Sequence, residues 1–136
     1  MLSKAAVIGF LASVALEAAS CTLPSLNGKD WAFSAWNTPG CKGNPTHTFR
    51  GNIDWDTPCA HVPCTPFDKS THLNDHLASW AFTTSQGPRL YLYSDVNCGG
   101  RRQDFGGTTA SSNAGPDLQQ TSSFKVCGSR NFAESS

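Results

Sequence analysis

Residues 33–43 read FSAWNTPGCKG, and residues 90–100 read LYLYSDVNCGG. Both stretches contain an aromatic residue, four intervening residues, a cysteine, one further residue and a glycine. The residues that define this pattern are Trp36, Cys41 and Gly43 in the first stretch and Tyr93, Cys98 and Gly100 in the second. The shared spacing predicts an internal repeat, in which one supersecondary unit occurs twice along the chain.

Strands are expected before each aromatic residue, because apolar side chains alternate there. Phe33 and Ala35 precede Trp36, while Leu90 and Leu92 precede Tyr93, and a period of two places each pair on one face of a strand. Glycine-, proline- and asparagine-containing turn signals recur every few residues, and helical periodicity is nearly absent. The sequence therefore predicts an all-β protein.

Each predicted strand leads into a tight hairpin over which the aromatic ring can fold. A glycine two positions after the cysteine supplies a backbone conformation with positive φ. A later strand then returns, at residues 78–82 in the first copy and 122–126 in the second, with Ser79 and Ser123 aligned. Two such units predict two four-stranded motifs whose inner faces pack as a sandwich.

This pattern resembles the Greek-key motif of the βγ-crystallin superfamily. It is similar in particular to small, secreted, cysteine-containing microbial members that resemble killer toxins. The second copy, about residues 88–128, matches well, whereas an insertion at residues 52–70 interrupts the first copy, about residues 29–84. Cysteine replaces the second aromatic residue in both copies. The resemblance implies a disulfide-stabilised sandwich of two Greek-key motifs.

Residues 1–20 have the pattern of a signal peptide. Lys4 is followed by an apolar run from Ala5 to Leu16 and then by small residues, and this run is too short to span a bilayer as a helix. We expect a secreted, extracellular protein with a single domain at residues 21–136.

Cysteine usage agrees with export from the cell. An even number of cysteines in a small exported chain predicts three disulfides here, although the sequence leaves their pairing open. The six cysteines are Cys21, Cys41, Cys59, Cys64, Cys98 and Cys127.

The charge and motif content exclude several functions. Without residues 1–20, which hold Lys4 and Glu17, the ten basic and ten acidic residues of the chain become nine of each, so nucleic acid is not expected as a partner. A monomer is expected. There is no G-x-S-x-G elbow, and the best carboxylate pair, Asp54 and Asp56, is more typical of an exposed turn than of a glycosidase. We therefore do not expect an enzyme.

The resemblance implies one possible metal site. Many members of the superfamily bind calcium through the pattern [ND]-[ND]-x-x-[ST]-Ser, but residues 74–79 read NDHLAS and residues 118–123 read LQQTSS, so neither copy is complete. Because family sites draw ligands from both motifs, the resemblance implies a weak composite calcium site from Asn74, Asp75 and Ser122. A degenerate loop that serves only as structure is the favoured alternative, and no other cofactor is expected. His72 and His76 would share a face on a helix, but solvent-facing side chains are the favoured interpretation.

Trp31 and Trp55 have no counterpart in the repeat. Either is a candidate platform for a sugar ring or a partner protein, with burial in the core as the alternative. We expect a small secreted cysteine-rich binding protein, a fungal effector or an antimicrobial protein like a killer toxin. Its partner would be an unidentified protein, glycan or membrane component on host or competitor cells. The alternative is a secreted carbohydrate- or cell-wall-binding module.

Overall fold

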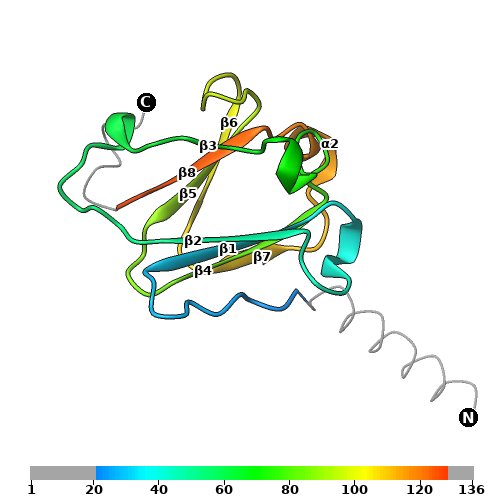
Figure 1. Ribbon diagram of the computed structural model, residues 1–136, viewed down its shortest axis with the longest axis horizontal. Coiled ribbons are helices and arrows are strands. Elements are labelled where there is room, and N and C mark those ends of the chain that lie inside the picture. The colour runs from blue at the N-terminus through cyan, green and yellow to red at the C-terminus, as the bar shows by residue number, and fades with distance from the viewer. Residues whose placement is uncertain (1–20, 129–136) are drawn as a thin grey trace, which may run out of the picture.

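The computed structural model describes residues 21–128; the predicted signal peptide and residues 129–136 lie outside the described residues. Two four-stranded antiparallel sheets face each other (Figure 1). The strands are β1 (Trp31–Trp36), β2 (His47–Gly51), β3 (Thr65–Pro66), β4 (Ser79–Thr84), β5 (Arg89–Tyr93), β6 (Arg102–Gly106), β7 (Thr109–Ser111) and β8 (Ser123–Cys127). The helices are short: η1 (Pro39–Cys41), η2 (Cys59–His61), η3 (Lys69–Thr71) and α2 (Gly115–Gln119). The predicted all-β sandwich is confirmed.

The strand order shows how the two copies are joined. One sheet, sheet A, has the order β2-β1-β4-β7, and the other, sheet B, has the order β3-β8-β5-β6. The first copy supplies β1 to β4 and the second supplies β5 to β8, so the third strand of each copy lies in the sheet of the other copy. This exchange is the Greek-key crossing, and it joins the two copies into one sandwich.

The core lies between the sheets and follows the predicted alternation. Leu90 and Leu92 point into it from β5, as do Phe33 and Ala35 from β1. The other members of this buried cluster are Phe67, Leu73, Leu77, Trp80, Phe82, Leu118, Phe124 and Val126. Full burial of each large apolar side chain contributes roughly 1.5–3 kcal/mol, so this cluster is the main stabilising feature.

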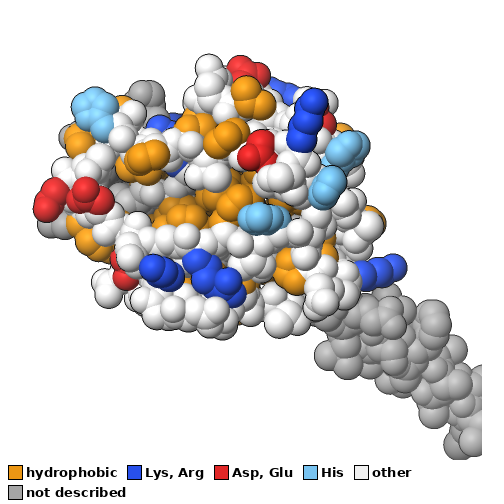
Figure 2. All heavy atoms as spheres, in the orientation of Figure 1, with side chains coloured by type: hydrophobic (Ala, Val, Ile, Leu, Met, Phe, Trp, Pro, Cys, Tyr) orange, Lys and Arg blue, Asp and Glu red, His pale blue; other side chains and the backbone are white. Residues whose placement is uncertain are grey.

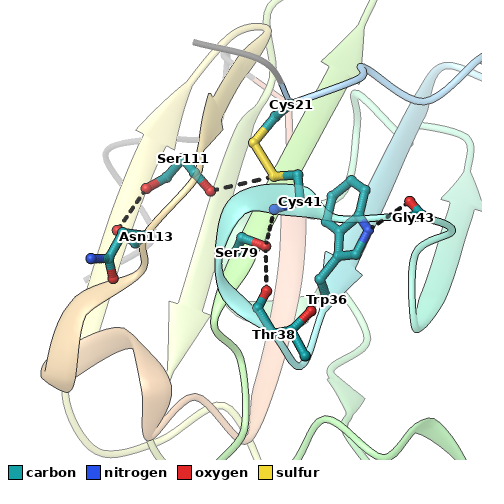
Figure 3. Close-up of a disulfide and its surroundings, with 8 residues drawn as sticks. All are labelled: Cys21, Trp36, Thr38, Cys41, Gly43, Ser79, Ser111 and Asn113. Carbon is teal, nitrogen blue, oxygen red and sulfur yellow. Dashed lines mark hydrogen bonds between the residues drawn. A yellow bond between two sulfur atoms is a disulfide. The ribbon is translucent and has the colours of Figure 1, made fainter. Parts of the chain in front are cut away.

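The first hairpin is held by a serine from the returning strand. The Ser79 hydroxyl accepts a hydrogen bond from the backbone N–H of Cys41 at 3.0 Å and donates one to the carbonyl of Thr38 at 2.8 Å (Figure 3). Cys41 has a φ of 51° and Gly43 a φ of 68°, which folds the chain back towards the ring of Trp36. The indole Nε1 of Trp36 then donates to the Gly43 carbonyl at 3.2 Å.

The second hairpin repeats this arrangement. The Ser123 hydroxyl accepts from the backbone N–H of Cys98 at 3.0 Å and donates to the carbonyl of Asp95. Cys98 and Gly100 have φ values of 59° and 73°, close to those of the first hairpin. Tyr93 ends its strand and is buried, as Trp36 is in the first copy. The internal repeat predicted from spacing is confirmed, including the alignment of the two serines.

Disulfides fasten a non-strand segment over the outer face of each sheet. The N-terminal segment, residues 21–30, follows the outer face of sheet A and is joined to η1 by Cys21–Cys41 (Figure 1). The insertion crosses the outer face of sheet B, where Cys59–Cys127 and Cys64–Cys98 fix it. The predicted three disulfides are confirmed, and such bonds persist in oxidising compartments.

Side chains reach the surface where the two sheets meet. Figure 2 shows hydrophobic side chains along the middle of this face, with charged and histidine side chains around them. Phe49 of edge strand β2 is partly buried against the core and stacks on Phe33 and Phe67. Across residues 21–128, no helix has the length and apolar character needed to cross a membrane.

Candidate functional site

The loops expected to form a composite calcium site come together. The Ser122 hydroxyl donates to Oδ1 of Asp75 at 3.3 Å, and the backbone N–H of Asp75 donates to the Thr121 carbonyl, also at 3.3 Å. Asp75 has a φ of 59°, a left-handed conformation that aspartate tolerates better than most residues. Asn74, next to it, is exposed.

The oxygen donors at this contact fit calcium poorly. Calcium takes six to eight oxygen ligands, often with several carboxylates, and the Asp75 carboxylate is the single acidic group of the proposed set. Within residues 21–128, no three His, Cys, Asp or Glu side chains gather as a metal-binding group. Calcium binding by Asn74, Asp75 and Ser122 stays a prediction, and these donors favour weak binding.

The equivalent loop of the second copy is occupied by a cationic side chain. The Arg101 guanidinium donates to the Asp117 carboxylate at 3.2 Å and to the side-chain carbonyl of Gln120 at 2.6 Å. Arg101 and Asp117 line a cleft of about 250 Å³ together with Arg102 and Leu118. Because the Arg101 guanidinium, from the residue before β6, bridges to α2 and to the residue after α2, we interpret it as a structural contact.

The carboxylate pair of the insertion has the geometry of a turn. Asp54 accepts hydrogen bonds from the Thr57 hydroxyl at 2.6 Å and from the backbone N–H of Asp56 at 3.0 Å. The Thr57 hydrogen bond is the main cause that holds the pKa of Asp54 below its ordinary value. A glycosidase acid instead needs a raised pKa, so this carboxylate does not suit that role.

The two histidines of the first copy do not share a helix. Lys69–Thr71 is a short 3₁₀ helix, and His72 follows it with a φ of 55°. Both His72 and His76 are exposed, as the favoured interpretation predicted.

Both candidate tryptophans are partly buried. Trp31 packs against the core, with ring centroids 6.0 Å from Phe124 and 6.4 Å from Phe82. Trp55 lies so close to Gly128 that a Cβ built there would be 2.7 Å from the indole ring. Each indole therefore has a structural contact, and a role of Trp31 or Trp55 as a binding platform stays a prediction.

Charged and aromatic groups on the outer face of sheet B hold the insertion. Lys125 donates to the Cys59 carbonyl at 3.0 Å, and its Nζ lies 5.9 Å from the ring centroid of Tyr93. Burial raises the pKa of Tyr93. Burial also lowers the pKa of Lys125, and the nearby charge of Arg102 lowers it further. These contacts hold the insertion over the outer face of sheet B, so a ligand has little access to this face.

A groove that the sequence analysis did not single out lies on the outer face of sheet A. Its volume is about 480 Å³. We call it the outer groove: its floor is formed by β1 and β2, and its walls by residues 22–25 and 43–45. The floor side chains are Ser34, Trp36, Thr48 and Arg50. Strand alternation places these four side chains opposite the core, but the sequence carries no signal for the walls.

No protein-family model and no curated protein matches the sequence. Among solved structures, one from a study of the evolution of the eye lens βγ-crystallin domain fold is similar over 79% of this chain and 94% of that chain, with 15% identity and a TM-score of 0.53. The N-terminal domain of Protein S is similar over 72% of this chain and 97% of its own, with 15% identity and a TM-score of 0.45. A βγ-crystallin domain from Flavobacterium johnsoniae covers 71% and 94% of the respective chains, with 18% identity and a TM-score of 0.45. The first similarity, together with the repeated serine-held hairpins, shows that this chain has a βγ-crystallin-like fold.

Proposed function

We propose that this protein is secreted and acts by binding a molecule on the surface of host or competitor cells, as a microbial effector or a killer-toxin-like protein does. The observation that carries the proposal is the set of three disulfides. Each joins a segment outside the strands to another part of the sandwich. Fixed covers of this kind suit a protein that must keep its binding surface among extracellular proteases.

The side chains offer more support for binding than for catalysis. The Asp54 carboxylate is used in a turn, and the Arg101 guanidinium is used in a bridge to α2. All six cysteines are paired, so a thiolate nucleophile is absent. The balanced charge of the chain also gives little attraction to nucleic acid.

Binding to intact cells tests this proposal. The oxidised mature protein, carrying a fluorescent label, is added to fungal, bacterial and plant cells, and bound fluorescence is measured with growth and host-response assays. We expect saturable binding to at least one cell type. Growth inhibition would identify a toxin, and a host response without inhibition would identify an effector.

Reduced and alkylated protein is the matched control, because it has the same composition without the three covalent links. Loss of binding in this control shows that the folded surface is responsible. Equal binding by the folded and the alkylated protein, or binding to none of the cell types, would contradict the proposal.

A further inference from the structure

We propose that the outer groove binds a chain of neutral sugars. This inference rests on the proposed function, because it names the class of surface molecule that the protein binds. It differs from the wall-binding alternative drawn from the sequence, which depended on exposed Trp31 or Trp55. The rigidity, the chemistry and the charge of the outer groove each support it.

Both walls of the outer groove are fixed to its floor. Cys21–Cys41 anchors the start of the first wall (Figure 3), and Arg50 Nε donates to the Ser25 carbonyl at 2.9 Å at the other end of that wall. The second wall is held by the indole hydrogen bond of Trp36 to Gly43. A ligand therefore meets a formed site and does not have to order it, which reduces the entropic cost of binding.

The lining of the outer groove matches the mixed chemistry of a sugar ring. Sugars have hydroxyl rims and apolar C–H faces, so they need hydrogen-bonding groups beside apolar surfaces. Leu23, which is 47% exposed, lines the groove together with its sequence neighbours Thr22 and Pro24. The accessible hydrogen-bonding side chains are Thr22, Ser25, Asn44, Thr48 and Arg50, and the accessible apolar ones are Leu23, Pro24 and Pro45. Ser34 and Trp36, each 2% exposed, close the floor beneath them.

The half-buried hydroxyl of Thr48 keeps hydrogen-bonding capacity for a ligand. It lies 2.9 Å from the hydroxyl of Ser34, which is 2% exposed, and the two share one hydrogen bond. A hydroxyl has one donor and two acceptor positions, so Thr48 retains at least one lone pair for a ligand. Arg50 uses Nε for the wall, and its terminal nitrogens provide further donors.

Charge and backbone geometry favour a neutral sugar over other ligands. Arg50 is the one charged side chain in the lining, and a single positive charge attracts a polyanion only weakly. An extended peptide that adds to a sheet pairs with a free strand edge, whereas the floor of the outer groove is the face of β1 and β2. The volume of about 480 Å³ also falls within the roughly 300–1,000 Å³ of ligand pockets.

Retention on insoluble neutral polysaccharides tests the assignment. The oxidised mature protein is mixed with chitin, β-1,3-glucan or cellulose, with pectate as an anionic comparison, and the unbound fraction is measured at low and high salt. We expect saturable retention on at least one neutral polysaccharide, with little change on adding salt. Retention by pectate alone that disappears in salt would overturn the assignment.

Two variants place the ligand in the outer groove. Ser25→Trp fills the groove from its first wall and keeps the backbone carbonyl that accepts from Arg50, so retention should weaken by about tenfold or more. Asn44→Ala removes a side-chain amide from the second wall, and loss of one hydrogen bond corresponds to about three- to tenfold. Asn52→Ala, at an exposed asparagine outside the lining, is the matched control and should bind as the original protein does.

Melting temperatures of the variants will be compared with that of the original protein to check that each variant keeps the fold. Unchanged retention in Ser25→Trp would overturn the inference, as would loss of retention in Trp55→Ala with full retention in Ser25→Trp. The cell-binding experiment separates this inference from the proposed function. Protein that binds cells but no neutral polysaccharide overturns the groove assignment alone, and protein that binds neither overturns both.

Discussion

Replacing Ser79 or Ser123 with alanine should destabilise the protein strongly for so small a change. Both side chains are fully buried, and each hydroxyl accepts from one backbone N–H and donates to one carbonyl. Alanine keeps nearly the same volume and removes both hydrogen bonds. The change therefore tests the hairpin contact without leaving a large cavity.

The size of the effect follows from the two backbone groups that lose their partners. A net hydrogen bond contributes about 1 kcal/mol, and a buried group without a partner costs about 1–3 kcal/mol. Cys41 and Cys98 are partly buried, while Thr38 and Asp95 are exposed, so water can replace the lost donor at each carbonyl but less well at each N–H. We expect each variant to lose about 2 kcal/mol of unfolding free energy.

Equilibrium unfolding in guanidinium chloride measures this loss. With a slope of roughly 3 kcal/mol per molar denaturant, a loss of about 2 kcal/mol lowers the midpoint by about 0.7 M. Ser85→Ala, at an exposed serine, should stay within about 0.5 kcal/mol of the original protein. The two buried serines should give similar losses because their contacts repeat. A loss below about 0.5 kcal/mol in either variant would refute the role of these hydroxyls.

Three further predictions concern the hairpins, the insertion and the metal. Gly100→Ala should lower the melting temperature more than Gly43→Ala does, as measured by thermal melts. A Cβ at residue 100 would lie 2.2 Å from the hydroxyl oxygen of Ser94, whereas a Cβ at residue 43 would have no neighbour within 4 Å. Replacing Cys59–Cys127, which closes 68 residues, with serines should cost about 4 kcal/mol under the chain-entropy model, measured by denaturant unfolding. Calorimetry should give a calcium dissociation constant in the millimolar range or weaker, and Asp75→Asn should abolish this binding. A micromolar dissociation constant would contradict the poor fit of the oxygen donors.

The hairpins could be predicted from the sequence because their determinants are local. Alternating apolar residues fix which face of a strand is buried, and the glycine two positions after each cysteine marks a turn with positive φ. Trp36 and Tyr93 therefore end equivalent strands, as their spacing predicted. The serines on the returning strands could be aligned because each follows the same pattern in its own copy.

The crossing strands and the disulfide pairs could not be predicted in this way. β3 is Thr65–Pro66, a pair that is too short to alternate and contains a proline, which usually argues against a strand. Disulfide pairing depends on which cysteines approach in the folded chain, and the insertion reaches β8 only through tertiary packing. Local sequence patterns carry no information on the crossing strands or on the pairing of the cysteines.

The candidate sites also differ in whether a sequence pattern or tertiary packing determines them. The contact of Asp75 with Ser122 joins residues 47 positions apart, and it was expected because calcium sites of the family that the chain resembles draw ligands from both motifs. The outer groove has no such symmetry. Its first wall is an irregular segment held by a disulfide and by Arg50, so neither its course nor its distance from β1 follows from the residues alone.

The different side chains on the two outer faces explain why the groove lies on sheet A. Tyr91 and Tyr93 fill the space under the insertion on sheet B, where they pack with Cys59, Cys127 and Val62. On sheet A, Ser34 stands at the repeat position of Tyr91 on the outer face of β1, beside Trp36. The serine side chain is much smaller than the tyrosine ring, so the same kind of disulfide-fastened cover closes one face and leaves a hollow on the other. Replacing Ser34 with a large residue should therefore remove the outer groove without disturbing sheet B.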